Sequence, residues 1–128
     1  MILSIIGSRN LNLNLKKYIK IDRISKIITG GARGIDKCAE KFARENKIPL
    51  EIISPDYGTY GVRAPAIRNR KIVDLCDSLI AFWDGVSRGT KMTIDFAISS
   101  KKLTTVFFLK NGIIQRKDYD FSNQLKLF

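Results

Sequence analysis

Short apolar, β-branched runs alternate along this chain with longer segments of helical spacing, and this alternation restricts the fold more than any other feature. A strand, a crossover helix and a second strand form a parallel pair, so repetition of the unit predicts a parallel sheet covered by helices. The expected strands are 2–6, 24–28, 50–53, 78–82 and 103–109. We therefore predict an α/β, doubly wound fold with about five parallel strands and helices on both faces.

The segments between these strands are predicted to contain the helices, at 13–21, 34–46, 66–76 and 90–100. In the second of them, apolar residues recur at spacings of three and four, which is typical of one buried helix face. In the third, the expected inward residues are Ile67, Ile72, Leu75 and Cys76. The segment from Ser54 to Pro65 is rich in Gly, Pro and Tyr, so we expect an irregular loop that walls or covers a site.

The length of 128 residues favours one compact domain. We assign 1–110 to a ligand-binding domain and 111–128 to a C-terminal hairpin or tail packed on the same domain. The turn residues Asn111 and Gly112 predict an antiparallel hairpin, with an edge strand at 113–116.

Composition limits the chemistry of the chain. It has no His and only two Cys, far apart in sequence, so we expect no metal site, no disulfide framework and no cofactor. No apolar run is long enough for a membrane span, and the first residues lack signal-peptide features, so we expect no membrane partner and a cytoplasmic location. The net charge of +11 favours anionic partners, although an evenly basic surface that serves solubility explains most charges equally well.

Three loops directly follow predicted strands and contain small or basic residues. They are GSR at 7–9, TGGARGID at 29–36 and WDGVSRGT at 83–90. The carboxyl ends of parallel strands meet at one edge, where doubly wound sheets bind ligands, and two of these loops lead into helices whose free N–H groups attract anions. The glycines at 30, 31 and 34 do not match G-x-G-x-x-G, and the chain has no Walker A sequence.

Each glycine and acid of these loops also has a structural explanation. Gly30 and Gly31 suit a tight strand-to-helix turn, and Asp36 complements a helix dipole by about 0.3–1 kcal/mol. Arg33 gains little structurally between its neighbours and is well suited to hold a phosphate or carboxylate.

The third loop has the same two interpretations. Either Ser87 or Thr90 is expected to cap the helix that follows. Trp83 and Asp84 serve either as core and cap or as a stacking surface and a hydroxyl acceptor for a ribose or base, and we favour the second.

Together with RNRKIV at 68–73, the three loops resemble the SLOG superfamily of Rossmann-like proteins, most closely its small stand-alone, YspA-like members. TGGARGID and RNRKIV are also similar to segments of the DNA-processing protein A (Smf) family, and the late Gly-Thr loop is similar to that of the Lonely Guy phosphoribohydrolases. The resemblance covers about 1–110. It implies a Rossmann-like fold, a nucleotide or nucleotide-derived ligand, association into a homo-oligomer and, for some small members, a role in bacterial or phage conflict systems.

The resemblance also implies which residues bind the ligand. It places the first loop against the ligand, the second at the phosphate side and the third at phosphate or ribose, with two further residues from the start of a helix. Including Asp36, Trp83 and Asp84, the predicted site is Gly7, Ser8, Arg9, Gly30, Gly31, Arg33, Asp36, Arg68, Asn69, Trp83, Asp84, Gly85, Ser87, Gly89 and Thr90.

The expected function is to sense or sequester a nucleotide, or a cyclic or ADP-ribose-type derivative. One alternative is a nucleotide phosphoribohydrolase that cleaves an N-glycosidic bond, with Asp84 as base and Arg68 stabilising charge. The Lonely Guy enzymes have a catalytic Glu three residues after the Gly-Thr pair, whereas this chain has Thr93, and Asp95 is turned about 200° away on a helix. The other alternative is binding of single-stranded nucleic acid.

Overall fold

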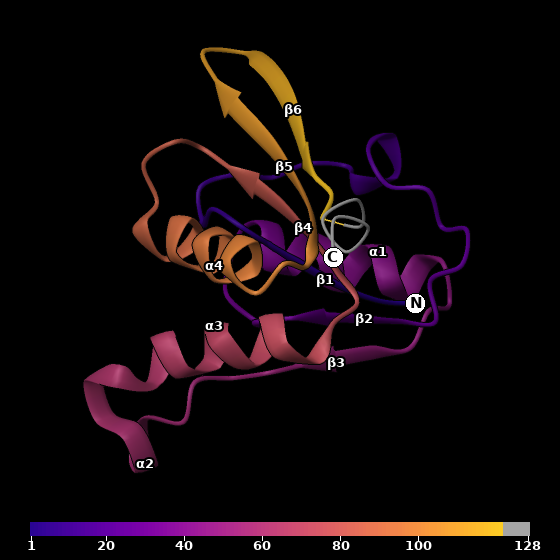
Figure 1. The fold of residues 1–128 in the computed structure, drawn as a ribbon. Coiled ribbons are helices and arrows are strands. Elements are labelled where there is room, and N and C mark those ends of the chain that lie inside the picture. Colours follow the sequence, from indigo (N-terminus) through magenta and orange to yellow (C-terminus); the bar gives the residue numbers. More distant parts are fainter. Residues whose placement is uncertain (122–128) are drawn as a thin grey trace, which may run out of the picture.

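The computed structural model describes residues 1–121 and contains one mixed sheet of six strands, in the order β3-β2-β1-β4-β5-β6 (Figure 1). The first five strands are parallel, and β6 pairs antiparallel with β5. The strands are β1 (Ile2–Gly7), β2 (Lys26–Thr29), β3 (Leu50–Ile52), β4 (Ser78–Trp83), β5 (Leu103–Lys110) and β6 (Ile113–Tyr119). The α/β class and the C-terminal hairpin are thereby confirmed.

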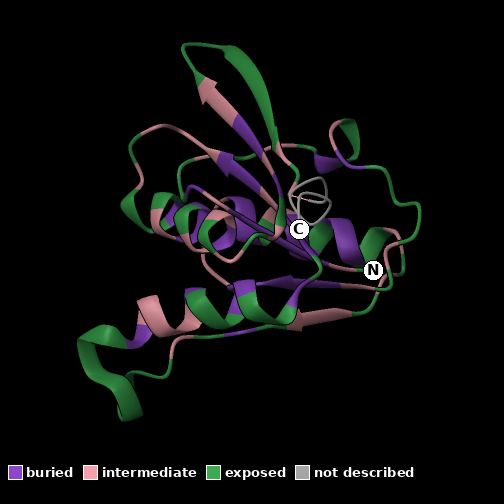
Figure 2. Cartoon of the chain, in the orientation of Figure 1, coloured by how far each residue is buried: buried purple, intermediate pink, exposed green. Residues whose placement is uncertain are grey.

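Helices cover both faces of the sheet because successive side chains of each strand point to opposite sides. From β1, Leu3 and Ile5 join one apolar cluster with α1 (Ile35–Glu45), whereas Ile6 joins a second cluster with α3 (Ala64–Leu75) and α4 (Arg88–Ser99). Figure 2 shows that buried residues concentrate in the central strands and on the inner helix faces. The core therefore consists of two layers separated by the sheet.

The order of the strands creates a point where the winding reverses. From β1 the chain proceeds outward through β2 and β3, then returns to the other side of β1 with β4 and continues to β5. The carboxyl ends of β1 and β4 therefore lie side by side. After β1 the chain continues toward β2, and after β4 it continues toward β5 on the opposite side. A crevice forms at this position in open parallel sheets.

The predicted helix at 13–21 is wrong. Only a single 3-10 turn, η1 (Leu15–Lys17), forms there. The side chain of Asn14 accepts a hydrogen bond from the Lys16 backbone N–H, which satisfies the turn locally. Asparagine side chains compete in this way with helix propagation, and the segment has Asn at both 12 and 14.

The predicted irregular loop at 54–65 is also wrong. It contains α2 (Tyr57–Tyr60) and the 3-10 turn η2 (Gly61–Arg63), and α3 already begins at Ala64. Asp56 begins α2 by accepting a hydrogen bond from the Thr59 N–H at 3.1 Å. This segment projects from the rest of the molecule beside the start of α3 (Figure 1), and its residues 57–63 are exposed.

Two smaller corrections concern α3 and the hairpin. Leu75 is 42% exposed, and Val73 instead completes the buried stripe of α3. The Asn111-Gly112 turn has positive φ at both residues, which a type I′ hairpin requires, and β6 extends to Tyr119 rather than ending at 116. The predicted tail at 122–128 lies outside the described residues. No helix within residues 1–121 has the length and apolarity needed to cross a membrane.

Candidate functional site

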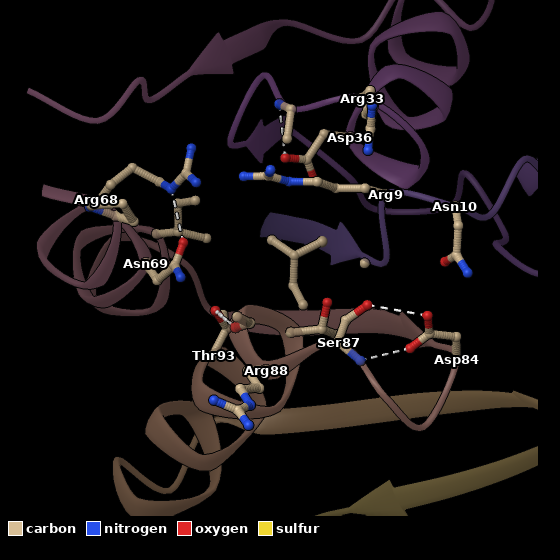
Figure 3. Close-up of a pocket in the computed structure, with 17 residues that line it drawn as sticks. Arg9, Asn10, Arg33, Asp36, Arg68, Asn69, Asp84, Ser87, Arg88 and Thr93 are labelled. Carbon is tan, nitrogen blue, oxygen red and sulfur yellow. Dashed lines mark hydrogen bonds between the residues drawn. The ribbon is translucent and has the colours of Figure 1, made fainter. Parts of the chain in front are cut away.

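A cavity of about 430 Å³ opens at the carboxyl edge of the sheet, between the ends of β1 and β4 and the starts of α1, α3 and α4 (Figure 3). It lies where the winding of the sheet reverses. Most of the predicted ligand-binding residues line it, namely Gly7, Arg9, Arg33, Asp36, Arg68, Asn69, Asp84, Ser87, Gly89 and Thr90. Three loops and a helix start that are far apart in sequence therefore meet at one place.

The predicted residues that do not line the cavity are Ser8, Gly30, Gly31, Trp83 and Gly85. Ser8 is buried, and its hydroxyl accepts a hydrogen bond from the Asp84 N–H at 3.0 Å, which joins the first loop to the third. A Cβ at Gly30 would lie 2.8 Å from Nη1 of Arg68 and 2.9 Å from Oδ2 of Asp36. Ser8 and Gly30 thus contact residues that line the cavity and help to position them.

Trp83 makes its contacts outside the cavity. Its indole N–H donates to the Ser87 carbonyl at 3.0 Å, and its ring packs edge-on against Phe108, with ring centroids 5.6 Å apart. Gly85, with φ of 83°, also packs against Phe108. These contacts favour the structural interpretation of Trp83.

The cavity also contains residues that were not predicted, including Asn10, Ala32, Pro65, Arg88 and Thr93. Thr93 is buried one helical turn after Gly89 and donates a hydrogen bond to the Gly89 carbonyl at 2.9 Å. Spacing of three from Thr90 on a helix places the two threonines on one face, and this signal was present in the sequence.

Arginine dominates the charge of the cavity. Four arginines line it against two aspartates, and the side chains of Arg9, Arg33 and Arg88 have no hydrogen bond or ion pair within residues 1–121. Burial lowers the pKa of the Arg68 guanidinium, an effect that Asp36 opposes and Arg9 reinforces. Figure 3 shows the Arg9 side chain extending across the cavity from the side of Arg33. An anion between these guanidinium groups would relieve their mutual repulsion.

Arg68 is held in position by the surrounding backbone. Its Nη1 donates to the carbonyl of Gly30 at 2.6 Å and to that of Ile53 at 3.4 Å, and its Nε donates to Oδ1 of Asn69 at 2.7 Å. These contacts leave the other terminal nitrogen, Nη2, without a protein partner within residues 1–121. Arg68 therefore connects α3 to the ends of β2 and β3 while retaining donors for a ligand.

The N-terminus of α4 presents free backbone donors to the cavity. The first backbone hydrogen bond of this helix runs from the Lys91 N–H to the Ser87 carbonyl, and within residues 1–121 the N–H groups of Arg88, Gly89 and Thr90 donate to no other group. Ser87 occupies the N-cap position, but its hydroxyl donates to Asp84 instead of capping the helix. A Cβ at Gly89 would meet no atom of the described part of the chain within 4 Å, so the backbone is open to a ligand.

The N-terminus of α1 is partly occupied by protein groups. The Ile35 N–H donates to the Ser8 carbonyl at 3.3 Å, and Oδ2 of Asp36 accepts from the Ala32 N–H at 3.1 Å. Burial raises the pKa of the Asp36 carboxyl, against the opposing effects of Ala32, Thr29 and Arg68. The TGGARGID loop thus supplies Arg33 and a buried carboxyl, and α4 supplies the free donors.

Asp84 stabilises its own loop. Its Oδ1 accepts from the N–H groups of Val86 and Ser87 at 2.9 and 2.8 Å, and its Oδ2 accepts from the Ser87 hydroxyl at 3.1 Å. Partial burial opposes ionisation, but these hydrogen bonds outweigh it and lower the pKa of Asp84 to about 2. Such a carboxylate is a weak base at neutral pH, so its predicted catalytic role stays a prediction that these contacts do not favour.

The lowered pKa of Asp84 predicts an acid-dependent loss of stability. Its folded-state pKa of about 2 lies below the ordinary value of 3.8, so its contribution is complete above pH 4 and is lost as the pH falls toward 2. Because solvent screens this partly exposed group, we expect Asp84→Asn to lower the free energy of unfolding by about 1 kcal/mol at pH 7 and progressively less toward pH 2. Urea unfolding at several pH values measures this. Asp22→Asn, an exposed change elsewhere, is the control, and a pH-independent difference for Asp84→Asn would contradict the assignment.

Searches with protein-family models, curated proteins and solved structures found no match to this chain. Within residues 1–121 no three Cys, Asp or Glu side chains cluster closely enough to hold a metal ion, and both cysteines are free thiols. The charged and donor groups that line the cavity are its arginines, its two aspartates and the start of α4.

Proposed function

We propose that this protein binds a nucleotide or a nucleotide-derived ligand, including cyclic and ADP-ribose-type molecules, and acts as a sensor or sequestering protein. The observation that carries the proposal is the combination of unpaired arginines and free helix N–H groups in one cavity. Its volume of about 430 Å³ suits such a ligand, since small-molecule sites measure roughly 300–1,000 Å³.

The phosphate of the ligand would bind at the start of α4. The open backbone at Gly89 allows close approach, and the helix dipole favours negative charge there. Arg9 and Arg68 would contact the same phosphate or a second one from the opposite side. Asp36 and Asn69 are then left as the polar groups that a ribose or base would meet.

We further propose that the fold is a doubly wound, Rossmann-like one of the SLOG superfamily, of the small YspA-like kind. The order β3-β2-β1-β4-β5 agrees with the arrangement 3-2-1-4-5 of dinucleotide-binding folds. The homo-oligomer, the cytoplasmic location and the role in conflict systems stay predictions.

The side chains of α4 favour binding over cleavage. Thr93 occupies the position at which the Lonely Guy enzymes have their catalytic Glu, and it contributes a hydroxyl to the cavity. Asp95 is exposed and bonds to Lys91 at 2.8 Å, outside the residues that line the cavity. The phosphoribohydrolase is therefore the less supported alternative.

A thermal-shift screen against mononucleotides, cyclic nucleotides and ADP-ribose tests the proposal. A ligand at 100 times its dissociation constant stabilises the protein by about 2.7 kcal/mol, which corresponds to a rise in Tm of roughly 8–10 °C for a chain of this size. A screen in which none of these compounds raises the Tm would overturn the proposed function.

Gly89→Ala separates ligand binding from stability. We expect the Tm of the ligand-free protein to rise slightly, since alanine in a helix adds about 0.4–1 kcal/mol relative to glycine. The ligand-induced shift should fall sharply, because the new methyl group enters the open space at the start of α4. Gly58→Ala, in the exposed helix α2, is the matched control and should leave the ligand-induced shift unchanged. An undiminished shift in Gly89→Ala would exclude α4 as the phosphate site.

A further inference from the structure

A second cavity of about 650 Å³ adjoins the first, and the two share Arg9 and Asn10 as lining residues. The second cavity lies between the segment Leu11–Asn14 and the outer side of α1, where Lys37 and Lys41 are exposed. The first loop thus forms a ridge with a cavity on either side.

The second cavity has the chemistry of an anion site. Arg9, Lys37 and Lys41 line it together with three asparagines, and no acidic residue among residues 1–121 does so. Lys37 pairs with Glu40 at 3.1 Å and Lys41 with Glu45 at 3.8 Å. The Lys41–Glu45 pair is exposed, and such pairs contribute little, so the Lys41 ammonium can turn to a phosphate. The Glu40 carboxylate is buried, whereas the Lys37 ammonium beside it is exposed, so Lys37 can contact a phosphate while it stays paired with Glu40.

The ridge between the cavities is held firmly. Gly34 packs directly beneath it, since a Cβ there would lie 2.5 Å from the carbonyl oxygens of both Ser8 and Arg9. The Ser8 carbonyl also accepts from the N–H groups of Leu11 and Ile35, at 3.4 and 3.3 Å. The backbone of Arg9 is therefore positioned by α1, while its unpaired guanidinium is available to a ligand.

We propose that the ligand is a linear dinucleotide. One phosphate would bind in the first cavity, and the second would bind beyond Arg9, in the cavity lined by Lys37 and Lys41. This inference rests on the proposed function. A mononucleotide would occupy only the first cavity and leave the second basic surface without an anion. Two phosphates joined through a nucleoside match two adjoining basic cavities that share an arginine.

Calorimetric titration with 5′-phosphorylated dinucleotides of each base and with the matching monophosphates tests the inference. We expect the best dinucleotide to bind at least about tenfold more tightly than its monophosphate, because the second phosphate binds intramolecularly. In the double variant Lys37→Gln and Lys41→Gln this advantage should disappear, whereas the affinity for the monophosphate should stay within about twofold. Lys41→Gln alone, which leaves the Lys37–Glu40 pair intact, should lose part of the advantage.

The double variant Lys71→Gln and Lys110→Gln is the matched control, because it removes the same charge from exposed positions outside both cavities. If monophosphates bind and dinucleotides bind no better, the extended ligand is wrong and the proposed function stands. If the control weakens dinucleotide binding as much as the Lys37 and Lys41 changes do, the gain is general electrostatic attraction and the inference is overturned. If no compound binds, both proposals fail.

Discussion

Arg9→Gln is expected to weaken nucleotide binding by roughly 10- to 100-fold, since hydrogen bonds to charged groups contribute about 1.5–3 kcal/mol. The Arg9 side chain is exposed and unpaired within residues 1–121 while it extends into the cavity. Its loss should therefore leave the free energy of unfolding of the ligand-free protein within about 0.5 kcal/mol of wild type. Titration with the best nucleotide from the screen, together with urea unfolding, measures both quantities.

Arg23→Gln is the control for this change. Arg23 is exposed and lies at the opposite, amino-terminal edge of the sheet, where its carbonyl accepts from the N-terminus at 2.6 Å. The same loss of charge there should alter affinity by less than about twofold, since exposed charges at that range are largely screened. Equal losses in the two variants would mean that net charge, and not the cavity, attracts the ligand.

Gly34→Ala is expected to cause the largest loss of stability, about 3 kcal/mol or more, which would lower the Tm by roughly 10 °C. Gly34 has φ of 78° and ψ of −128°, a conformation that is open only to glycine. A methyl group would also overlap backbone oxygens of the first loop at 2.5 Å, and backbone cannot move aside as a flexible side chain can. Thermal and urea unfolding of the purified variant measure the loss.

Gly58→Ala provides the comparison, since Gly58 has ordinary helical backbone and its Cβ would meet only Oδ1 of Asp56, at 3.6 Å. That change should be neutral or slightly stabilising. A Gly34→Ala protein as stable as Gly58→Ala would show that the first loop moves freely relative to α1, and the rigid ridge between the two cavities would then have to be abandoned.

The sequence predicted the sheet well, because strand pattern is local. Each parallel strand appears as a short apolar run, and the observed bounds differ from the predicted ones by one or two residues. The Asn111-Gly112 turn predicted the hairpin for an equally local reason, its positive φ angles. The failures at 13–21 and 54–65 arose where side chains of Asn14 and Asp56 bond to nearby backbone, which hydrophobic spacing does not register.

The candidate site was predicted less completely. Residues directly after strands were placed in the cavity because parallel strand ends converge at one edge of a sheet. Trp83 lies elsewhere, since its indole bonds back to Ser87 and packs on Phe108. Thr93 was missed because it lies within a helix and does not directly follow a strand. The direction of its side chain depends on how α4 packs on the sheet.

By itself the sequence determined the α/β class, the hairpin and the three loops that meet at one edge, since all of these follow from local backbone preference and from parallel connectivity. Only the tertiary structure decided which helix start has more backbone donors free for an anion. At α1 the Ser8 carbonyl of the first loop accepts from the first helical N–H, that of Ile35, whereas at α4 the Ser87 side chain turns to Asp84 and leaves the first N–H groups of the helix open. The contact at α1 joins Ser8 and Ile35, which lie far apart in the chain, and no local pattern encodes such a contact.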